Sequence, residues 1–211
     1  MSSSNPPHDH SAIESVESPS YFEILEISVR ELLTEKGLIS ADELRRQIEV
    51  LDSRNPALGA KVVARAWNDP EFRGRLLEDG SKACEELGIT MYDDTKLIVV
   101  PNTVEVHNVL VCTLCSCYPR PVLGLPPDWY KSKSYRARVV KNPRNVLSEF
   151  GLKIAQNRSI RVHDSNANMR YLVLPMRPAG TEGWSEEALA EIVTSDTMIG
   201  VAEPDPARKS C

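Results

Sequence analysis

The sequence predicts an α+β protein in which an N-terminal helical arm precedes a globular domain. Along much of the first 87 residues, apolar side chains recur every three or four residues, as on the buried face of an amphipathic helix. Farther on, residues 96–101 and 106–111 form β-branched apolar runs that are typical of strands. Helices are therefore expected to dominate the beginning of the chain, and strands are expected to enter later.

Two helices are expected in the arm, which we place at residues 21–55. The first begins at Tyr21 and ends at Gly37, and Ser40 opens the second with a glutamate three residues on, the pattern of a capping box. Both helices have a narrow apolar face and little to pack against, so we expect the arm to lie on a partner subunit. Residues 1–20, rich in Ser, Pro, His and Asp, are expected to form a disordered tail.

The globular domain is expected to span residues 56–205, with residues 206–211 as a flexible C-terminus. Helical patterns in this domain cover residues 58–67, 70–78, 81–87, 129–141 and 143–150, and Ser185 begins a final helix. Two further strands are expected at residues 160–162 and 170–174. The proline-rich stretch 118–127, which follows a cluster of cysteines, is expected to be irregular.

Composition argues against two classes of partner. The formal net charge is −5, and Lys and Arg are dispersed rather than gathered into a basic patch, so we expect no nucleic acid. No apolar run approaches the roughly 20 residues needed to cross a bilayer, so we expect no membrane. The first residues lack the basic and apolar regions of a signal peptide, and the predicted location is therefore cytoplasmic.

The five cysteines stand at positions 84, 112, 115, 117 and 211, so that three of them fall within six residues. An odd count clustered in this way is poor material for a disulfide framework, and in a reducing compartment it favours metal or redox chemistry. For Cys84, which lies in a helical pattern, the simplest interpretation is a small buried residue. The candidate site is thus the segment from Cys112 to Cys117, directly after a predicted strand.

Several kinds of metal site are compatible with the spacing C-x2-C-x-C. A zinc site needs a fourth ligand, and no second cysteine pair or histidine pair accompanies the turn, since His107 and His163 are isolated. Cys84 could supply a fourth thiolate, and an iron–sulfur cluster would also need a fourth cysteine. Alternatively, backbone amide nitrogens in so tight a turn could bind a trivalent metal beside the sulfurs.

Residues 111–119, Val-Cys-Thr-Leu-Cys-Ser-Cys-Tyr-Pro, closely resemble the metal-binding motif of nitrile hydratase α subunits and of the related thiocyanate hydrolase γ subunits. The resemblance extends over residues 60–201 and implies a layered α-β-β-α arrangement for the globular domain. It is carried by the segments Val63–Phe72, Leu123–Tyr130, Tyr135–Val139, Leu174–Trp184 and Met198–Gly200.

The resemblance implies a non-corrin metal centre with a defined ligand set. The ligands would be the sulfurs of Cys112, Cys115 and Cys117 together with the backbone nitrogens of Ser116 and Cys117. Cys115 would be oxidised to a sulfinate and Cys117 to a sulfenate, two rungs of the thiol oxidation ladder. Arginines of a partner subunit would hold these oxidised sulfurs, and a metallochaperone would deliver the metal.

The metal expected from the resemblance is Co(III) rather than Fe(III), because Thr113, with Tyr118 later in the segment, resembles the cobalt-type pattern. Such a metal acts as a Lewis acid toward a small-molecule nitrile, which is hydrated to the amide. The nucleophile would be water or the oxygen on Cys117, and the Ser116 hydroxyl would lie near the substrate.

Two departures from the family pattern bear on the substrate. Most cobalt-type nitrile hydratases have Trp at the position of Arg120, whereas thiocyanate hydrolase has an arginine there. Such an arginine would put a permanent positive charge close to the site, and a structural contact to a partner subunit explains it equally well. The Gln that many members place upstream of the motif is absent, and Asp93 in that stretch cannot replace an amide donor when ionised. In addition, residues 22–38 resemble thiocyanate hydrolase, whereas Leu125–Pro127 has the nitrile hydratase form.

The main interpretation is therefore the metal-bearing subunit of a nitrile hydratase. Its partner would be a β-type subunit, or a β chain split in two as in the three-subunit group that includes toyocamycin nitrile hydratase. One alternative is the γ subunit of a thiocyanate hydrolase, which forms carbonyl sulfide and ammonia. Another is a non-enzymatic module that carries metal reversibly on unoxidised thiols.

Overall fold

The computed structural model describes residues 20–91, 95–115 and 117–208. The chain divides into two compact units, Met1–Ile48 and Glu49–Cys211. Within the described ranges, no helix combines the length and the apolar character that a bilayer span requires. The boundary predicted near residue 55 between arm and domain stays a prediction.

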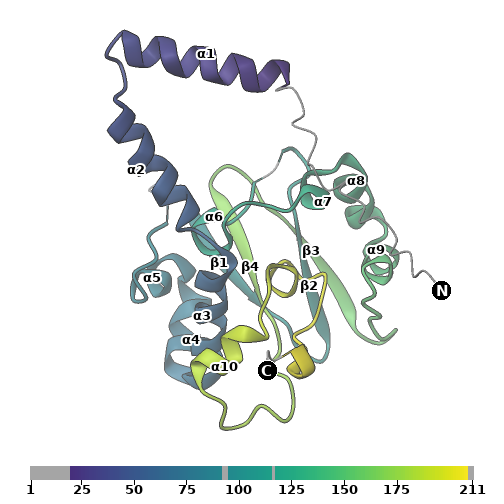
Figure 1. The fold of residues 1–211 in the computed structure, drawn as a ribbon. Coiled ribbons are helices and arrows are strands. Elements are labelled where there is room, and N and C mark those ends of the chain that lie inside the picture. The colour runs from purple at the N-terminus through teal and green to yellow at the C-terminus, as the bar shows by residue number, and fades with distance from the viewer. Residues whose placement is uncertain (1–19, 92–94, 116, 209–211) are drawn as a thin grey trace, which may run out of the picture. The chain divides into compact units, whose positions relative to one another are not determined.

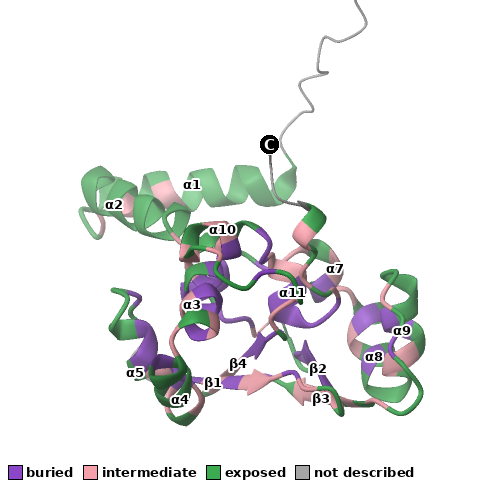
Figure 2. Cartoon of the chain, turned by 90° about the horizontal axis from the view of Figure 1, so that it is seen from below, coloured by how far each residue is buried: buried purple, intermediate pink, exposed green. Residues whose placement is uncertain are grey.

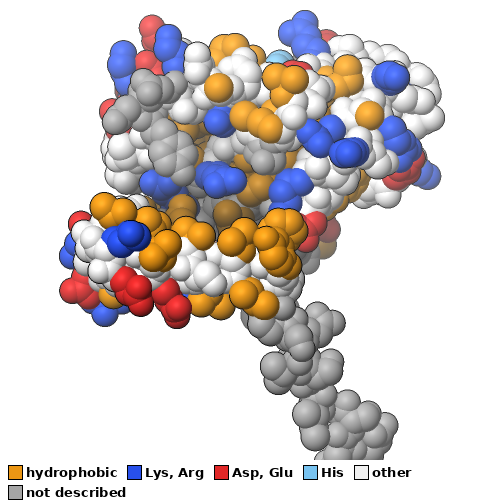
Figure 3. Space-filling view, turned by 90° about the horizontal axis from the view of Figure 1, so that it is seen from above, with side chains coloured by type: hydrophobic (Ala, Val, Ile, Leu, Met, Phe, Trp, Pro, Cys, Tyr) orange, Lys and Arg blue, Asp and Glu red, His pale blue; other side chains and the backbone are white. Residues whose placement is uncertain are grey.

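Two helices lead the described chain (Figure 1). α1 spans Tyr21–Glu35 and α2 spans Ala41–Asp52. Ser40 and Glu43 make the predicted capping box: the Ser40 hydroxyl accepts the Glu43 N–H at 3.2 Å, and the Glu43 carboxylate accepts the Ser40 N–H at 2.9 Å. Neither helix contains a buried residue, and apolar side chains lie along the surface of α1 (Figure 3).

Three helices follow at short intervals. α3 spans Pro56–Asn68, α4 spans Pro70–Glu78 and α5 spans Gly80–Glu85. Asp69 caps α4, because its carboxylate accepts two N–H groups of the first turn, at 3.0 and 2.9 Å. Pro70 fits next to this cap, since the first turn of a helix leaves its N–H groups unpaired.

Four strands form two small parallel sheets. β1 (Lys96–Pro101) pairs with β4 (Met169–Leu174), and β2 (Val106–Val111) pairs with β3 (Ser159–Asp164). β1 and β2 have the bounds that their β-branched runs predict. Five of the six residues of β2 are buried, as expected for a parallel strand covered on both faces.

The two sheets contact each other through β2 and β4, and helices pack outside them (Figure 2). α4 and α5 lie against β1, and α9 (Pro143–Glu149) lies against β3. α11 (Ser195–Ile199) packs on β4, while α10 (Glu186–Glu191) packs on α3. The predicted α+β class is confirmed, with N-terminal helices ahead of a layered domain of helices and small sheets.

The single helix predicted at residues 129–141 is wrong, because the chain forms two helices there. α7 spans Asp128–Lys131 and α8 spans Lys133–Lys141. Ser132 separates them with an extended backbone (φ −63°, ψ 138°), and its hydroxyl accepts the Tyr135 N–H at 3.1 Å, which caps α8.

Short helices also occur where none was predicted. The proline-rich stretch contains α6 (Arg120–Leu123), whose prolines lie in and before the first turn and therefore do not break it. Ser185 caps α10 as predicted, but α10 is not the final helix, since α11 and a 3-10 turn at Pro206–Arg208 follow. These elements have five residues or fewer, too few to display a helical period.

A buried polar network holds the start of β2. The Asn102 side chain accepts the Asn108 N–H at 2.7 Å and contacts the His107 ring at Nδ1, 3.3 Å away. His107 Nε2 lies 2.8 Å from the Gly200 carbonyl, so it carries the proton that this carbonyl accepts. Burial lowers the pKa of His107, which keeps the ring neutral in this arrangement.

Candidate metal centre

The cysteine turn begins where two parallel strands end together. Val111 at the end of β2 lies opposite Asp164 at the end of β3. Thr113, two residues beyond β2, donates its N–H and its hydroxyl to the two oxygens of the Asp164 carboxylate, at 2.9 and 2.5 Å. The strand pairing therefore delivers the carboxylate that fixes the first part of the turn.

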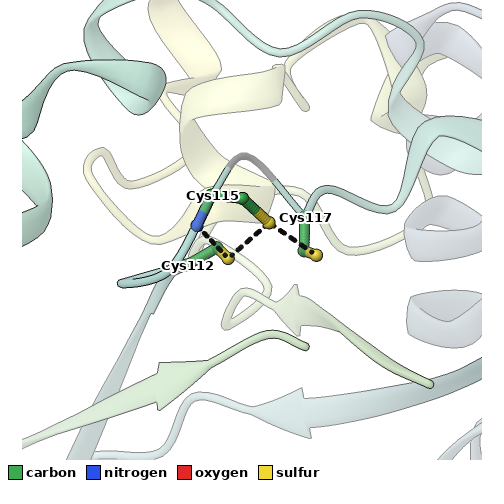
Figure 4. A group of neighbouring side chains, drawn as sticks. All are labelled: Cys112, Cys115 and Cys117. Carbon is green, nitrogen blue, oxygen red and sulfur yellow. Dashed lines mark hydrogen bonds between the residues drawn. The ribbon is translucent and has the colours of Figure 1, made fainter. Parts of the chain in front are cut away.

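Three cysteine sulfurs converge within this turn (Figure 4). The Sγ atoms of Cys112 and Cys115 are 3.4 Å apart, and those of Cys115 and Cys117 are 3.2 Å apart. All three sulfurs lie within 4.8 Å of one another, close enough to bind one metal ion together. The Cys115 N–H also points to the Cys112 sulfur, 3.3 Å away, so the turn closes on itself.

The three thiols differ in exposure, which gives the site an inner and an outer side. Cys112 is fully buried, Cys117 is half-buried and Cys115 is exposed. The neighbouring Leu114 side chain is 84% exposed. A metal bound to the three sulfurs would thus be held from the protein interior and would remain reachable from outside.

Two side chains from the following helices hold the far part of the turn. The Tyr130 hydroxyl, from α7, donates to the Cys117 carbonyl at 3.0 Å. Arg136, from α8, donates through Nη1 to the carbonyls of Cys115 and Thr113, at 3.1 and 3.4 Å. Burial raises the pKa of Tyr130 above its usual range, so the phenol stays protonated and remains a donor.

The residues present fit a transition-metal ion that prefers sulfur ligands. Burial, and next the hydrogen bond with Cys115, raise the pKa of Cys117 to about 12, against the opposing positive charge of Arg170. Because metal ligation requires the thiolate, a metal bound to Cys117 would displace this proton. Thiolates select transition-metal ions over Ca²⁺ or Mg²⁺, which prefer oxygen ligands.

The fourth-ligand alternatives gain no support from the described part of the chain. Cys84 and both candidate histidines lie outside the group of sulfurs that could share one metal. Cys84 is fully buried on α5, as its helical pattern predicts. His163 lies 2.8 Å from the Asn108 side chain through Nε2. Ser116 and Asp93 lie outside the described residues.

The aromatic and basic residues that follow the turn in sequence separate into distinct groups. Tyr118 and Tyr130 are buried and stack edge-to-face at 5.1 Å, so both pack in the core behind the turn. Arg138 pairs with Glu149 on the surface. The Arg177 guanidinium contacts Thr181 and the chain around Trp67, so it holds local structure. The contacts of Arg136 and Asp164 with the turn are not indicated by any motif in the sequence.

Arg120 occupies the first turn of α6 and is exposed. No hydrogen bond or ion pair joins its guanidinium to another residue in the described ranges. The arginine therefore presents its positive charge at the surface.

Comparison with known proteins identifies the family. The family model for the nitrile hydratase alpha chain matches residues 20–202, which include both the strands and the cysteine turn. The chain belongs to this family. It is 53% identical over 180 residues to the low-molecular weight cobalt-containing nitrile hydratase subunit alpha of Rhodococcus rhodochrous, covering 85% of this chain and 87% of that subunit.

The nitrile hydratase alpha chain family also contains relatives with another activity. The gamma subunit of thiocyanate hydrolase from Thiobacillus thioparus is 48% identical over 202 residues, covering 90% of this chain and 83% of that subunit. A solved structure of recombinant thiocyanate hydrolase with partially modified cobalt centres superimposes with a TM-score of 0.85 at 46% identity, covering 91% of this chain and 94% of that chain. Identity alone therefore does not separate the two activities.

The burial of Cys84 leads to a prediction for the reactivity of its thiol. Burial, and next the charge of Glu85, raise its pKa from the ordinary 9.0 to about 12, so the native thiol stays protonated at neutral pH. We expect iodoacetamide at pH 8 to label Cys84 at least about 100-fold more slowly in the native protein than in guanidinium, as for a buried thiol. Mass spectrometry of the tryptic peptide 83–96, whose only cysteine is Cys84, measures this rate.

The same shift sets a pH dependence of stability. Between pH 9.0 and about 12, the unfolded chain loses the Cys84 proton that the native chain keeps, so the free energy of unfolding falls as the pH rises. A Cys84→Ala variant is expected to lose this part of the alkaline slope. Equal slopes in urea titrations of the two proteins would contradict the assignment.

Proposed function

We propose that this chain is the metal-bearing subunit of a nitrile hydratase, which converts a nitrile to the corresponding amide. One observation carries the proposal: three cysteine sulfurs converge at the end of a buried strand, with Cys112 buried, Cys117 half-buried and Cys115 exposed. The family supports it, since a relative that is 53% identical is a cobalt-containing nitrile hydratase subunit.

The metal that this proposal assigns to the turn is Co(III). Cys112, Cys115 and Cys117 would hold it through sulfur, and the backbone nitrogens of Ser116 and Cys117 would complete the protein ligands. Bound there, the metal supplies Lewis acidity that polarises the carbon–nitrogen triple bond of a nitrile. Fe(III) is the weaker candidate, because the motif is of the cobalt type.

The side chains around the turn give each ligand a different task. Cys112, fully buried, anchors the metal from the protein side, and Asp164 keeps the strand end in place. We assign the reacting atoms to Cys117, which is half-buried on the outer part of the turn, and to Ser116, which the family resemblance implies. Tyr130 holds the Cys117 carbonyl and so fixes that part of the backbone.

The overall reaction adds one water molecule to the nitrile. Both O–H bonds of the water break and both hydrogens end on nitrogen, while the two π bonds of the carbon–nitrogen triple bond are replaced by a carbon–oxygen double bond. The attacking oxygen comes from water or from an oxygenated Cys117, and in the second case water restores the oxygen on that sulfur. Either route needs the open side of the turn, where the half-buried Cys117 and the exposed Cys115 lie.

Partner subunits are part of the proposal. The exposed apolar residues of α1 and α2, which include Phe22 at 77% and Leu25 at 44% exposure, suit a helical arm that lies on another subunit. A β-type partner, as one chain or as two, would also cover the outer side of the cysteine turn and supply arginines to the oxidised sulfurs. A metallochaperone would load the cobalt.

Thiocyanate hydrolysis is the second candidate, and Arg120 is the observation that favours it. Its exposed guanidinium, three residues after Cys117, would place a permanent positive charge near an anionic substrate such as thiocyanate. We rank nitrile hydration first because several relatives of similar identity are nitrile hydratase subunits.

The ligand model is tested on the chain co-expressed with its partner subunits in cobalt-containing medium. We expect about one tightly held cobalt per chain, which a chelator removes only slowly. The tryptic peptide 97–131, in which Pro121 protects the Arg120 bond, should carry three added oxygens, two on Cys115 and one on Cys117. Unoxidised cysteines in an active preparation would refute the ligand model and favour a metal-carrying module.

A further inference from the structure

Arg136 contacts the cysteine turn, although it is not one of the proposed metal ligands. Its Nη1 donates to two carbonyls of the turn, those of Cys115 at 3.1 Å and Thr113 at 3.4 Å. The residue lies on α8, whose start is fixed by the Ser132 cap and whose neighbour Tyr135 is buried. The guanidinium therefore reaches the turn from a helix that is itself held in place.

We propose that Arg136 is a positioning residue that locks the cysteine turn in the form that binds metal. Its contact with Cys115 and Thr113 spans the segment between the first and second sulfur ligands. If this segment relaxed, the backbone would no longer hold the Sγ atoms of Cys112 and Cys115 at their separation of 3.4 Å. The inference rests on the proposed function, because it gives Arg136 a task only if the turn holds a metal.

Charge adds to this geometric role. The Cys115 carbonyl belongs to the peptide group that joins Cys115 to residue 116, whose nitrogen is a proposed metal ligand. A peptide group that binds a trivalent cation through nitrogen carries negative charge on its oxygen, and a guanidinium at that oxygen stabilises it. A neutral donor at the same place would supply the hydrogen bond without this charge.

A second observation concerns the same side chain. Arg136 Nε is buried and has no hydrogen-bond acceptor in the described part of the chain, which is uncommon for a buried donor. An oxygen added to a neighbouring cysteine is an acceptor of the kind that this N–H lacks. Arg136 would then contribute from within this chain to the stabilisation that is otherwise expected from partner arginines.

The test compares Arg136→Met with Arg138→Met in the complex co-expressed in cobalt-containing medium. Arg138 lies on the same helix, is half-exposed and pairs with Glu149, so its loss removes a similar side chain without touching the turn. We expect Arg136→Met to lose cobalt to EDTA about 10- to 100-fold faster than the control, the range for residues that orient metal ligands. Its sulfur-to-cobalt absorption bands should also shift, whereas those of Arg138→Met should match the wild type.

Arg136→Lys keeps the positive charge but not the planar guanidinium, so its rate of cobalt loss should fall between those of the wild type and Arg136→Met. If the methionine variant does not fold, as judged by circular dichroism, this lysine variant is compared with Arg138→Lys instead. Cobalt retention and absorption bands equal to those of the matched control would overturn the role of Arg136. A wild-type complex that binds no cobalt would instead overturn the proposed function, so the two failures are distinguishable.

Discussion

A Cys112→Ser variant, co-expressed with its partner subunits in cobalt-containing medium, is expected to lack both the cobalt and the nitrile-hydrating activity that we propose for the wild-type complex. Cys112 is fully buried and anchors the inner side of the turn. A serine hydroxyl does not ionise near neutral pH and is a harder ligand than a thiolate, so it cannot replace the sulfur on a soft site. Retained cobalt after chelator treatment should fall by more than about 100-fold, beyond the effect of losing a residue that merely orients a ligand.

Cys84→Ser is the matched control for this experiment. Cys84 is equally buried and undergoes the same chemical change, but it lies outside the group of converging sulfurs. Its substitution should cost stability while cobalt content and activity per folded complex stay at the wild-type level. If both variants lost cobalt to the same extent, the effect would come from folding and the assignment of Cys112 as a ligand would fail.

Gly200→Ala is expected to destabilise the fold severely. Gly200 ends α11 with φ +92°, and a Cβ added there would lie 2.0 Å from the Asn108 carbonyl oxygen, on the strand that leads into the cysteine turn. Backbone rather than a flexible side chain would have to move. We expect a loss of about 4 kcal/mol or more in the free energy of unfolding, the range of the most disruptive substitutions.

Gly183→Ala separates the loss of stability caused by the steric clash from the loss caused by the backbone conformation. Gly183 has a similar φ of +79°, but a Cβ there would meet no atom within 4 Å. Its substitution should lower the free energy of unfolding by about 1–2 kcal/mol, which is the cost of a left-handed backbone conformation for a residue with a Cβ atom. Urea unfolding followed by circular dichroism measures both variants, and equal losses would contradict the account of Gly200.

Local structure was predictable from the sequence where it depends on local chemistry. The cap of α2 by Ser40, the start of α4 at Pro70 and the bounds of β1 and β2 all follow from neighbouring residues. The break at Ser132 was missed because an extended serine interrupts an otherwise helical pattern for a single residue. The parallel pairings could not be predicted, because β1–β4 and β2–β3 join segments that are far apart in the sequence.

The cluster of cysteines was predictable from the sequence, but the side chains that support the turn were not. Three cysteines within six residues are visible in the sequence alone, and their convergence follows from a tight turn after a strand. Asp164 and Arg136 reach the turn only because β3 pairs with β2 and because α8 lies beside it. Such contacts depend on tertiary structure, and no spacing rule in the sequence indicates them.

The most direct test of the central claim is a parallel assay of the cobalt-loaded complex with a panel of nitriles and with thiocyanate. The proposed function predicts amide formation from at least one nitrile and no carbonyl sulfide from thiocyanate. Arg120 would then be a structural or substrate-specific variation of the nitrile hydratase site. Carbonyl sulfide and ammonia from thiocyanate, with every nitrile unchanged, would contradict the account and make Arg120 the first residue to substitute.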